Sequence, residues 1–246
     1  MKRGLFLAST ISAALSACSP IGTKLNDSRG FHDLLERAEQ LNEGFIGTRG
    51  RVTLYKPNEI SADFPVNSLD TPSDSLYAAL MRDRFQSYRL IVDGMVDHPL
   101  ALTLPQLQHL MNVIQITRHD CVEGWSAIAQ WQGVRVSDVI AMAAPRAGAR
   151  YAIFHSFDRD ANGTPYYESL SLEQAAHPQT LLALRQNGKP IAPDRGAPVR
   201  LTVPTQLGYK SAKWVRRIEI AASLAHSGSG KGGYWEDQGY EWYAGI

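Results

Sequence analysis

The 246-residue chain has little cysteine, almost no net charge and no long apolar run after its first residues, and each shortage excludes a class of protein. Two cysteines, Cys18 and Cys121, cannot form a framework of several disulfides. The 25 basic and 24 acidic residues give a formal net charge of +1, so the sequence predicts no nucleic-acid partner. No later segment reaches the roughly 18 apolar residues that a membrane-spanning helix needs. The remaining composition, 44% hydrophobic and 20% charged, is that of a globular protein.

The first 18 residues are typical of an export segment. Lys2 and Arg3 precede a short, mildly apolar stretch, and residues 15–18, Leu-Ser-Ala-Cys, resemble the lipobox of bacterial lipoproteins. In that interpretation Cys18 is acylated and carries a lipid anchor. The alternative is ordinary signal cleavage, with Cys18 incidental. Either way we expect an exported protein, in the periplasm or on the periplasmic face of a membrane.

Three further segments follow. We expect residues 19–75 to be an N-terminal tether and extension, residues 76–226 to be the main domain, and residues 227–246 to be a Gly-rich hinge with an aromatic tail that docks on that domain. Within the extension, residues 31–41 have the apolar spacing of a helix. That helix either packs on the main domain or binds a partner.

Short strands dominate the pattern of the main domain. Helices are expected over residues 76–85 and after the N-cap residues Thr103, Ser137 and Ser171. Strands and helices do not alternate regularly, which favours an α+β domain with mixed sheets and short helices over a doubly wound sheet. Asn187-Gly188 predicts a hairpin turn. The expected strands cover residues 88–92, 114–118, 131–134, 151–154, 166–170, 181–185, 198–203 and 214–220.

Cys121 is the candidate with the most chemistry. It lies in a run dense in polar side chains, from Arg118 to Ser126, and it is the only cysteine after the export segment. A lone thiol is either an inert buried residue or a group kept for its reactivity. A thiolate is a natural ligand for a soft or high-valent metal. It is also a nucleophile, and His119 would then be the nearby base of a metal-free thiol enzyme.

Two later blocks carry groups that bind anions. Arg200, in the block over residues 187–201, offers a planar fork of donors suited to phosphate or carboxylate. In the second block Gly208 permits a backbone turn, and Lys210 and Ser211 add a cation and a hydroxyl. Each block alone is typical of a solvated surface turn.

Taken together, the blocks resemble those of a known family. The run from Arg118 to Ser126, followed by Trp-Gln-Gly-Val at residues 131–134, resembles the metal-binding segment of the sulfite oxidase family of molybdenum enzymes. Residues 187–190, 195–200 and 208–211 resemble that family's later cofactor-binding blocks, in the same order. The resemblance covers about residues 88–220. It is strongest to the bacterial single-domain branch that includes the periplasmic methionine sulfoxide reductase catalytic subunit, and it implies the sulfite oxidase-like molybdopterin-binding fold.

The resemblance also implies roles for individual residues. Cys121 would supply the thiolate ligand to molybdenum, whose other sulfurs would come from one molybdopterin per chain. Arg118 would keep that thiolate deprotonated. Tyr167, or its neighbour Tyr166, would be the substrate-side tyrosine. The residues expected to hold the cofactor are Arg200 and Lys210 at the pterin phosphate, the backbone of Gly208 and Tyr209 with Ser211 close by, Arg195 and Ser156 facing the pterin, and His119 beside the metal.

The activity implied is two-electron oxygen-atom transfer on an S- or N-oxide or a sulfite-like substrate, either a small molecule or one borne on a protein. Electrons would pass to or from a separate cytochrome or quinone-linked membrane partner, and the chain would act as a monomer. Sulfite would require several arginines at the metal, for which Arg118, Arg159 and Arg195 are candidates. A metal-free thiol enzyme using Cys121, and a non-catalytic lipid-anchored binding protein, are the competing hypotheses.

Overall fold

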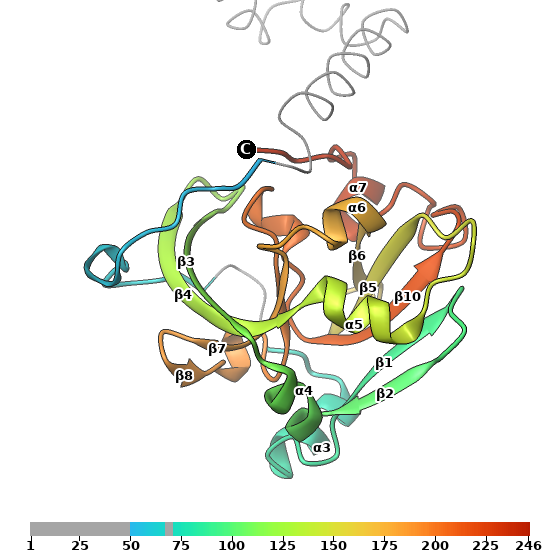
Figure 1. Ribbon diagram of the computed structural model, residues 1–246, viewed down its shortest axis with the longest axis horizontal. Helices are drawn as coiled ribbons and strands as arrows, with labels where there is room; N and C mark the ends of the chain where they lie inside the picture. Colours follow the sequence, from blue (N-terminus) through green and yellow to red (C-terminus); the bar gives the residue numbers. More distant parts are fainter. Residues whose placement is uncertain (1–49, 67–70) are drawn as a thin grey trace, which may run out of the picture. The chain divides into compact units, whose positions relative to one another are not determined.

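Two β-sheets form the framework of the residues that this computed structural model describes, 50–66 and 71–246 (Figure 1). The first sheet has five strands in the order β2-β1-β10-β5-β6. β1 pairs with β10 in parallel and every other pair in this sheet is antiparallel, so the sheet is mixed. Its strands are β1 (Arg89–Gly94), β2 (Leu100–Thr103), β5 (Tyr151–Arg159), β6 (Pro165–Ser171) and β10 (Val215–Ala221).

The second sheet is antiparallel, in the order β3-β4-β7-β8. β9 also pairs with β7, at residues 181–183. Figure 1 shows β3 and β4 as a long curved hairpin that extends away from the first sheet. Asn187 and Gly188 both have positive φ angles, 48° and 76°, which confirms the hairpin predicted between β7 and β8. The strands are β3 (Val113–Asp120), β4 (Ser126–Arg135), β7 (Leu181–Gln186), β8 (Lys189–Pro190) and β9 (Arg200–Thr202).

The helices are short, and local capping explains where several begin. The Asp74 carboxylate caps α3 (Ser75–Arg82). Thr103 and Ser171 cap α4 (Leu104–Leu110) and α6 (Leu172–Ala175) through reciprocal capping boxes, as predicted. The remaining helical elements are α5 (Val136–Ala143), α7 (Tyr234–Asp237) and the 3-10 turns η1 (Pro57–Glu59), η2 (Pro193–Arg195) and η3 (Gly208–Lys210).

The N-cap predicted at Ser137 is wrong, because α5 and its N-cap, Arg135, begin two residues earlier than predicted. β4 continues to Arg135, and that residue becomes the N-cap without a side-chain hydrogen bond. Val136, Val139 and Ile140 are buried on one face of α5, so packing rather than capping fixes where this helix starts. The α+β class, with mixed sheets and short helices, is as predicted.

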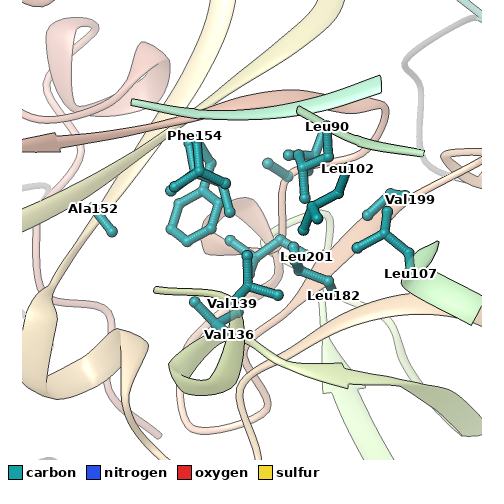
Figure 2. Packing of buried hydrophobic residues seen from close by; sticks show 14 of the residues in the cluster. Leu90, Leu102, Leu107, Val136, Val139, Ala152, Phe154, Leu182, Val199 and Leu201 are labelled. Atoms are coloured by element: carbon teal, nitrogen blue, oxygen red, sulfur yellow. The ribbon is translucent and has the colours of Figure 1, made fainter. Parts of the chain in front are cut away.

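The main core lies between the two sheets and is closed by α5. Leu90 and Phe154 reach it from the first sheet, Leu182 and Leu201 from the second, and Val139 from α5; all five are fully buried (Figure 2). A smaller cluster around Trp131 lies under the β3–β4 hairpin. Both clusters support the elements that carry the candidate site.

The expected export segment, the lipid-anchor residue Cys18 and the helix at residues 31–41 lie outside the described residues. None of the helices in the described part of the chain has the length and apolar character needed to cross a membrane.

We expect Leu182→Ala to lower the free energy of unfolding by about 2 to 5 kcal/mol, because it removes a fully buried side chain from the main core. Leu54→Ala is the control, since the Leu54 side chain is 62% exposed and its loss should change stability by less than about 0.5 kcal/mol. Denaturant unfolding of both variants measures the difference. Equal losses would mean that the core is not where the structure places it.

Candidate functional site

Cys121 is the first residue of the loop that connects β3 to β4, directly after β3 ends at Asp120. The Cys121 N–H donates to the Trp125 carbonyl at 2.9 Å, and the Gly124 N–H donates to the Cys121 carbonyl at 3.0 Å. Gly124 closes this turn with a φ of 88°, a conformation that favours glycine. The sequence prediction that a strand delivers Cys121 to a loop is therefore confirmed.

The thiol borders a cavity of about 230 Å³ whose walls come from distant parts of the chain. β3 and its loop supply His119 and Cys121, and the segment around η3 supplies Gly208, Tyr209 and Ser211. The other lining residues are Val122, Glu123, Asp158, Tyr166, Lys213, Trp235 and Tyr240.

Arg200 provides buried positive charge beside this cavity. Its side chain is buried on β9, Nη1 donates to the Arg195 carbonyl at 3.2 Å, and the guanidinium lies 5.3 Å from the centre of the Trp131 ring. Nε has no hydrogen-bond partner, and no carboxylate among the described residues pairs with this group. Burial, followed by the charge of Arg195, lowers the pKa of Arg200 to about 10. An anion placed here would compensate a charge that the described residues leave unneutralised.

Lys213 is the second cation at the cavity. Its Nζ donates to the Asp194 carbonyl at 3.2 Å and lies 4.1 Å from the centre of the Trp214 ring. Burial, followed by Arg200, lowers the pKa of Lys213 to about 7. Trp214 itself adopts a positive φ of 52°, an uncommon conformation that sits directly after the lysine. A bound anion would favour the charged form of Lys213.

Gly208 allows η3 to approach the hairpin closely. A Cβ atom at this position would lie 2.6 Å from Nε2 of His119, so only glycine fits beneath the imidazole. His119 packs against Phe64 and Trp125 with ring centres 5.6 Å away in both cases. Burial lowers the pKa of His119 to about 3, so the ring is neutral. His119 and Gly208, which were expected beside the metal and at the pterin phosphate, both border the cavity of Cys121.

Lys210 does not line the cavity, contrary to the expectation that its ammonium holds a phosphate there. Nζ lies 2.5 Å from Oε1 of Glu236 and 3.3 Å from Oε2 of Glu168, and all three side chains are fully buried. Burial raises the pKa of Glu168 well above its ordinary value, and the Lys210 charge opposes that rise. We call Lys210, Glu168 and Glu236 the buried ionic cluster. Lys213, three residues later, takes the position at the cavity.

Two other predicted residues also lie elsewhere. Arg118 is exposed, pairs with Asp120 at 2.9 Å and borders a different cavity, because alternate residues of β3 face opposite sides. Tyr167 donates to Asp237 Oδ2 at 2.7 Å and to the Ser227 carbonyl at 3.0 Å, whereas its neighbour Tyr166 lines the cavity. The geometry therefore does not support the expected role of Arg118 beside the thiolate or that of Tyr167 on the substrate side, and the alternative tyrosine, Tyr166, borders the cavity instead.

The last two predicted residues, Ser156 and Arg195, do not line the cavity but contact residues near it. Ser156 is buried and donates to the Lys213 carbonyl at 2.7 Å, so it holds the lysine backbone. Arg195 donates to the Phe64 carbonyl, lies 5.7 Å from the Phe64 ring centre and borders a neighbouring small cavity with Arg200 and Lys213. Neither borders the cavity that contains Cys121.

Asp158, Trp235 and Tyr240 border the cavity but were not predicted. Asp158 has one buried carboxylate oxygen without a hydrogen-bond partner, and burial raises its pKa to about 7. One sequence signal did point to the aromatic pair, since the aromatic tail was expected to dock on the domain. No local pattern marked Asp158, which lies on a strand otherwise read as buried and apolar.

The donor set fits an anionic cofactor that is held through sulfur. Burial raises the pKa of the Cys121 thiol, while the charge of Arg200 lowers it. A bound metal ion deprotonates a coordinating thiol outright. Lys213 lines the same cavity as Cys121, and the buried Arg200 borders the small neighbouring cavity together with Lys213 and His119. A soft thiolate beside two such cations suits a metal whose organic ligand carries a phosphate.

Comparisons with known proteins agree with this reading. The family model described as "Oxidoreductase molybdopterin binding domain" matches residues 77–227. Over 196 residues the chain is 36% identical to a putative protein-methionine-sulfoxide reductase subunit, YedZ1, of Azospira oryzae. That alignment covers 78% of this chain and 70% of the relative. It is 32% identical over 168 residues to the protein-methionine-sulfoxide reductase catalytic subunit MsrP of Campylobacter jejuni, covering 63% of this chain and 57% of that protein.

A solved structure shows the same fold. The sulfane dehydrogenase SoxCD of Paracoccus pantotrophus aligns with a TM-score of 0.50 and 24% sequence identity. The alignment covers 56% of this chain and 39% of the SoxCD chain. At this identity the similarity concerns the fold alone.

We expect Lys210→Met to lower the free energy of unfolding by about 3 to 5 kcal/mol, because it leaves Glu168 and Glu236 buried without their cation. Lys213→Met is the matched control, since burial already disfavours the Lys213 charge and its removal should cost much less. Denaturant unfolding of the cofactor-free protein measures both. The opposite order of effects would contradict the assignment of the two lysines.

Asp158→Asn should stabilise the cofactor-free protein increasingly as the pH rises. The pKa of Asp158 is about 7 in the folded chain and near 4 in the unfolded one, so folding binds a proton between these values. Wild-type stability therefore falls as the pH rises from about 4 to about 7, and the asparagine removes that loss. Melting temperatures of both proteins across pH 4 to about 8 measure the effect. A difference independent of pH would show that Asp158 ionises normally.

Proposed function

Since the chain belongs to the oxidoreductase molybdopterin-binding domain family, we propose that it is a molybdopterin-dependent reductase of neutral sulfoxides such as methionine sulfoxide. The single observation that carries this proposal is the half-buried Cys121 thiol beside the buried cations Arg200 and Lys213. When bound, the molybdenum–molybdopterin group supplies the two-electron redox chemistry of oxygen-atom transfer.

The protein residues hold and orient this group. Cys121 would provide the thiolate ligand, and the charges of Arg200 and Lys213 would bind the phosphate of one molybdopterin. Gly208 and Tyr209 place backbone against the same cavity, and His119, neutral and buried, packs beside the ligand. Burial raises the pKa of the Cys121 thiol, and the Arg200 charge opposes that rise.

The charges around the cavity favour a neutral sulfoxide over sulfite. A small dianion needs several exposed cations at the reacting centre, and the three candidate arginines lie elsewhere. Arg118 pairs with Asp120, Arg159 donates to the Gly163 carbonyl and Arg195 donates to the Phe64 carbonyl. The cavity itself adds the acidic side chains of Glu123 and Asp158, which oppose an anionic substrate.

The same geometry gives less support to the metal-free thiol enzyme. A nucleophilic cysteine requires a lowered thiol pKa or an adjacent base, and here burial raises the pKa of Cys121. His119 is held neutral by burial and packs against Phe64 and Trp125.

The electron partner is proposed to be a separate, membrane-associated protein on the periplasmic side. Both curated relatives are named as subunits of a reductase. Among residues 50–66 and 71–246, no group of three His, Cys, Asp or Glu side chains could hold a second metal centre. Electrons would therefore enter through the one cofactor.

We expect Cys121→Ser to fold, to lose bound molybdenum and to lose methionine sulfoxide reduction, because the hydroxyl replaces the thiolate ligand. Elemental analysis and reductase assays on protein made in a molybdate-replete bacterial host measure both properties. Cys18→Ser, which changes the other cysteine, should retain both. Full activity in Cys121→Ser, or a folded wild-type protein without molybdenum from that host, would contradict the proposed function.

A further inference from the structure

The segment after Gly233 builds one wall of the cavity, although it lies more than a hundred residues after Cys121 in the chain. Trp235, on α7, and Tyr240 line the same cavity as Cys121, and α7 packs against β6 (Figure 1). We propose that Trp235 and Tyr240 are specificity-determining residues that bind the sulfur atom and the apolar carbon groups of the sulfoxide substrate. This inference rests on the proposed function.

The two rings form a preorganised aromatic wall. The Trp235 and Tyr240 ring centres are 5.2 Å apart, and the Tyr240 N–H donates to the Trp235 carbonyl at 3.0 Å. Tyr209 packs edge-on against Tyr240 at 5.3 Å, and Tyr234 packs edge-on against Trp235 at the same separation. Because their neighbours already fix the rings, substrate binding does not have to order them.

The buried part of the cavity is ionic, and its exposed rim is apolar except for the Glu123 carboxylate. Lys213 and Asp158 are almost fully buried, whereas Tyr240 and Val122 are each 41% exposed and therefore lie at the mouth. A dialkyl sulfoxide has the same division, with a polar S–O group and apolar carbon chains. Sulfur and its methyl group contact aromatic edges favourably, at about 5 Å from the ring. The wall thus matches the carbon and sulfur of the substrate and leaves the polar oxygen to the interior.

The buried ionic cluster holds this wall in place. Glu236, the residue after Trp235, contacts Lys210 of η3, and Lys210 also contacts Glu168 of β6. Asp237 accepts from Tyr167, and the Tyr234 hydroxyl donates to Asp160 at 3.0 Å. These contacts place both neighbours of Trp235 against the body of the domain. Lys210 and Glu236 are therefore positioning residues for the wall.

Gly233 fits tightly against the cluster. A Cβ atom there would lie 1.8 Å from Oε1 of Glu168 and 2.0 Å from Oε2 of Glu236. Gly233→Ala must therefore displace these carboxylates or the start of α7, without replacing any charged side chain or any side chain that lines the cavity. This variant therefore tests the position of the Trp235 and Tyr240 rings while both rings remain present.

The test uses the molybdenum-loaded protein and two sulfoxides, methionine sulfoxide and dimethyl sulfoxide. We expect Trp235→Ala and Tyr240→Ala each to raise the KM for methionine sulfoxide about 10-fold or more, with kcat changed much less. The KM for dimethyl sulfoxide should rise less, because this probe has only methyl groups to contact the wall. Gly233→Ala should raise the KM for methionine sulfoxide in the same direction.

Molybdenum and pterin contents are measured on every variant, and Trp242→Phe is the control. Trp242 belongs to the same segment but does not line the cavity, so its KM values should match wild type. Intact cofactor with unchanged KM in Trp235→Ala and Tyr240→Ala would overturn this inference and leave the proposed function standing. Loss of pterin in Trp235→Ala would also overturn it, because the ring would then contact the cofactor. Absence of molybdenum in the wild-type protein would overturn the proposed function, and this inference with it.

Discussion

A guanidinium buried without a carboxylate partner is the constraint on which the candidate site depends. Arg200 lies inside the protein on β9, against the Trp131 ring, and its Nε makes no hydrogen bond within the described residues. Burying a charge is costly unless a counter-charge is close. Cys121 as a thiolate and a phosphate-bearing cofactor would both provide that counter-charge. The fold therefore leaves a positive charge where an anionic ligand completes the structure, and the identity of the family explains which ligand that is.

The two lysines of the Gly-Tyr-Lys-Ser-Ala-Lys block lie only three residues apart but have different surroundings. Lys210 ends the 3-10 turn η3 and points into the domain, where Glu168 and Glu236 enclose it. Lys213 precedes Trp214, whose positive φ changes the direction of the chain, and its ammonium reaches the cavity. In the proposed function, one lysine therefore contributes to stability and the other to cofactor binding. Spacing alone could not separate them, because both assignments depend on a turn that is fixed by tertiary packing.

The sequence predicted those features that local rules determine. Thr103 and Ser171 cap helices, Asn187-Gly188 forms the hairpin turn, and Cys121 follows a strand, since capping and turn preferences act over a few residues. The failures required knowledge of distant partners. Ser137 is not the N-cap of α5, because β4 extends further than its apolar pattern indicates. Tyr167 donates a hydrogen bond to Asp237, seventy residues away in the chain. Asp158, Trp235 and Tyr240 reach the cavity only through the sheet order and the docking of the last segment.

The position of the aromatic wall in the chain has a consequence for biosynthesis. Residues 234–246 leave the ribosome after all the other described residues, so both sheets and the loop of Cys121 can form before the wall exists. The wall of Trp235 and Tyr240 therefore forms only after the segments that carry Cys121, Arg200 and Lys213 have been synthesised. The buried contact between Lys210 and Glu236 joins this late segment to an earlier one.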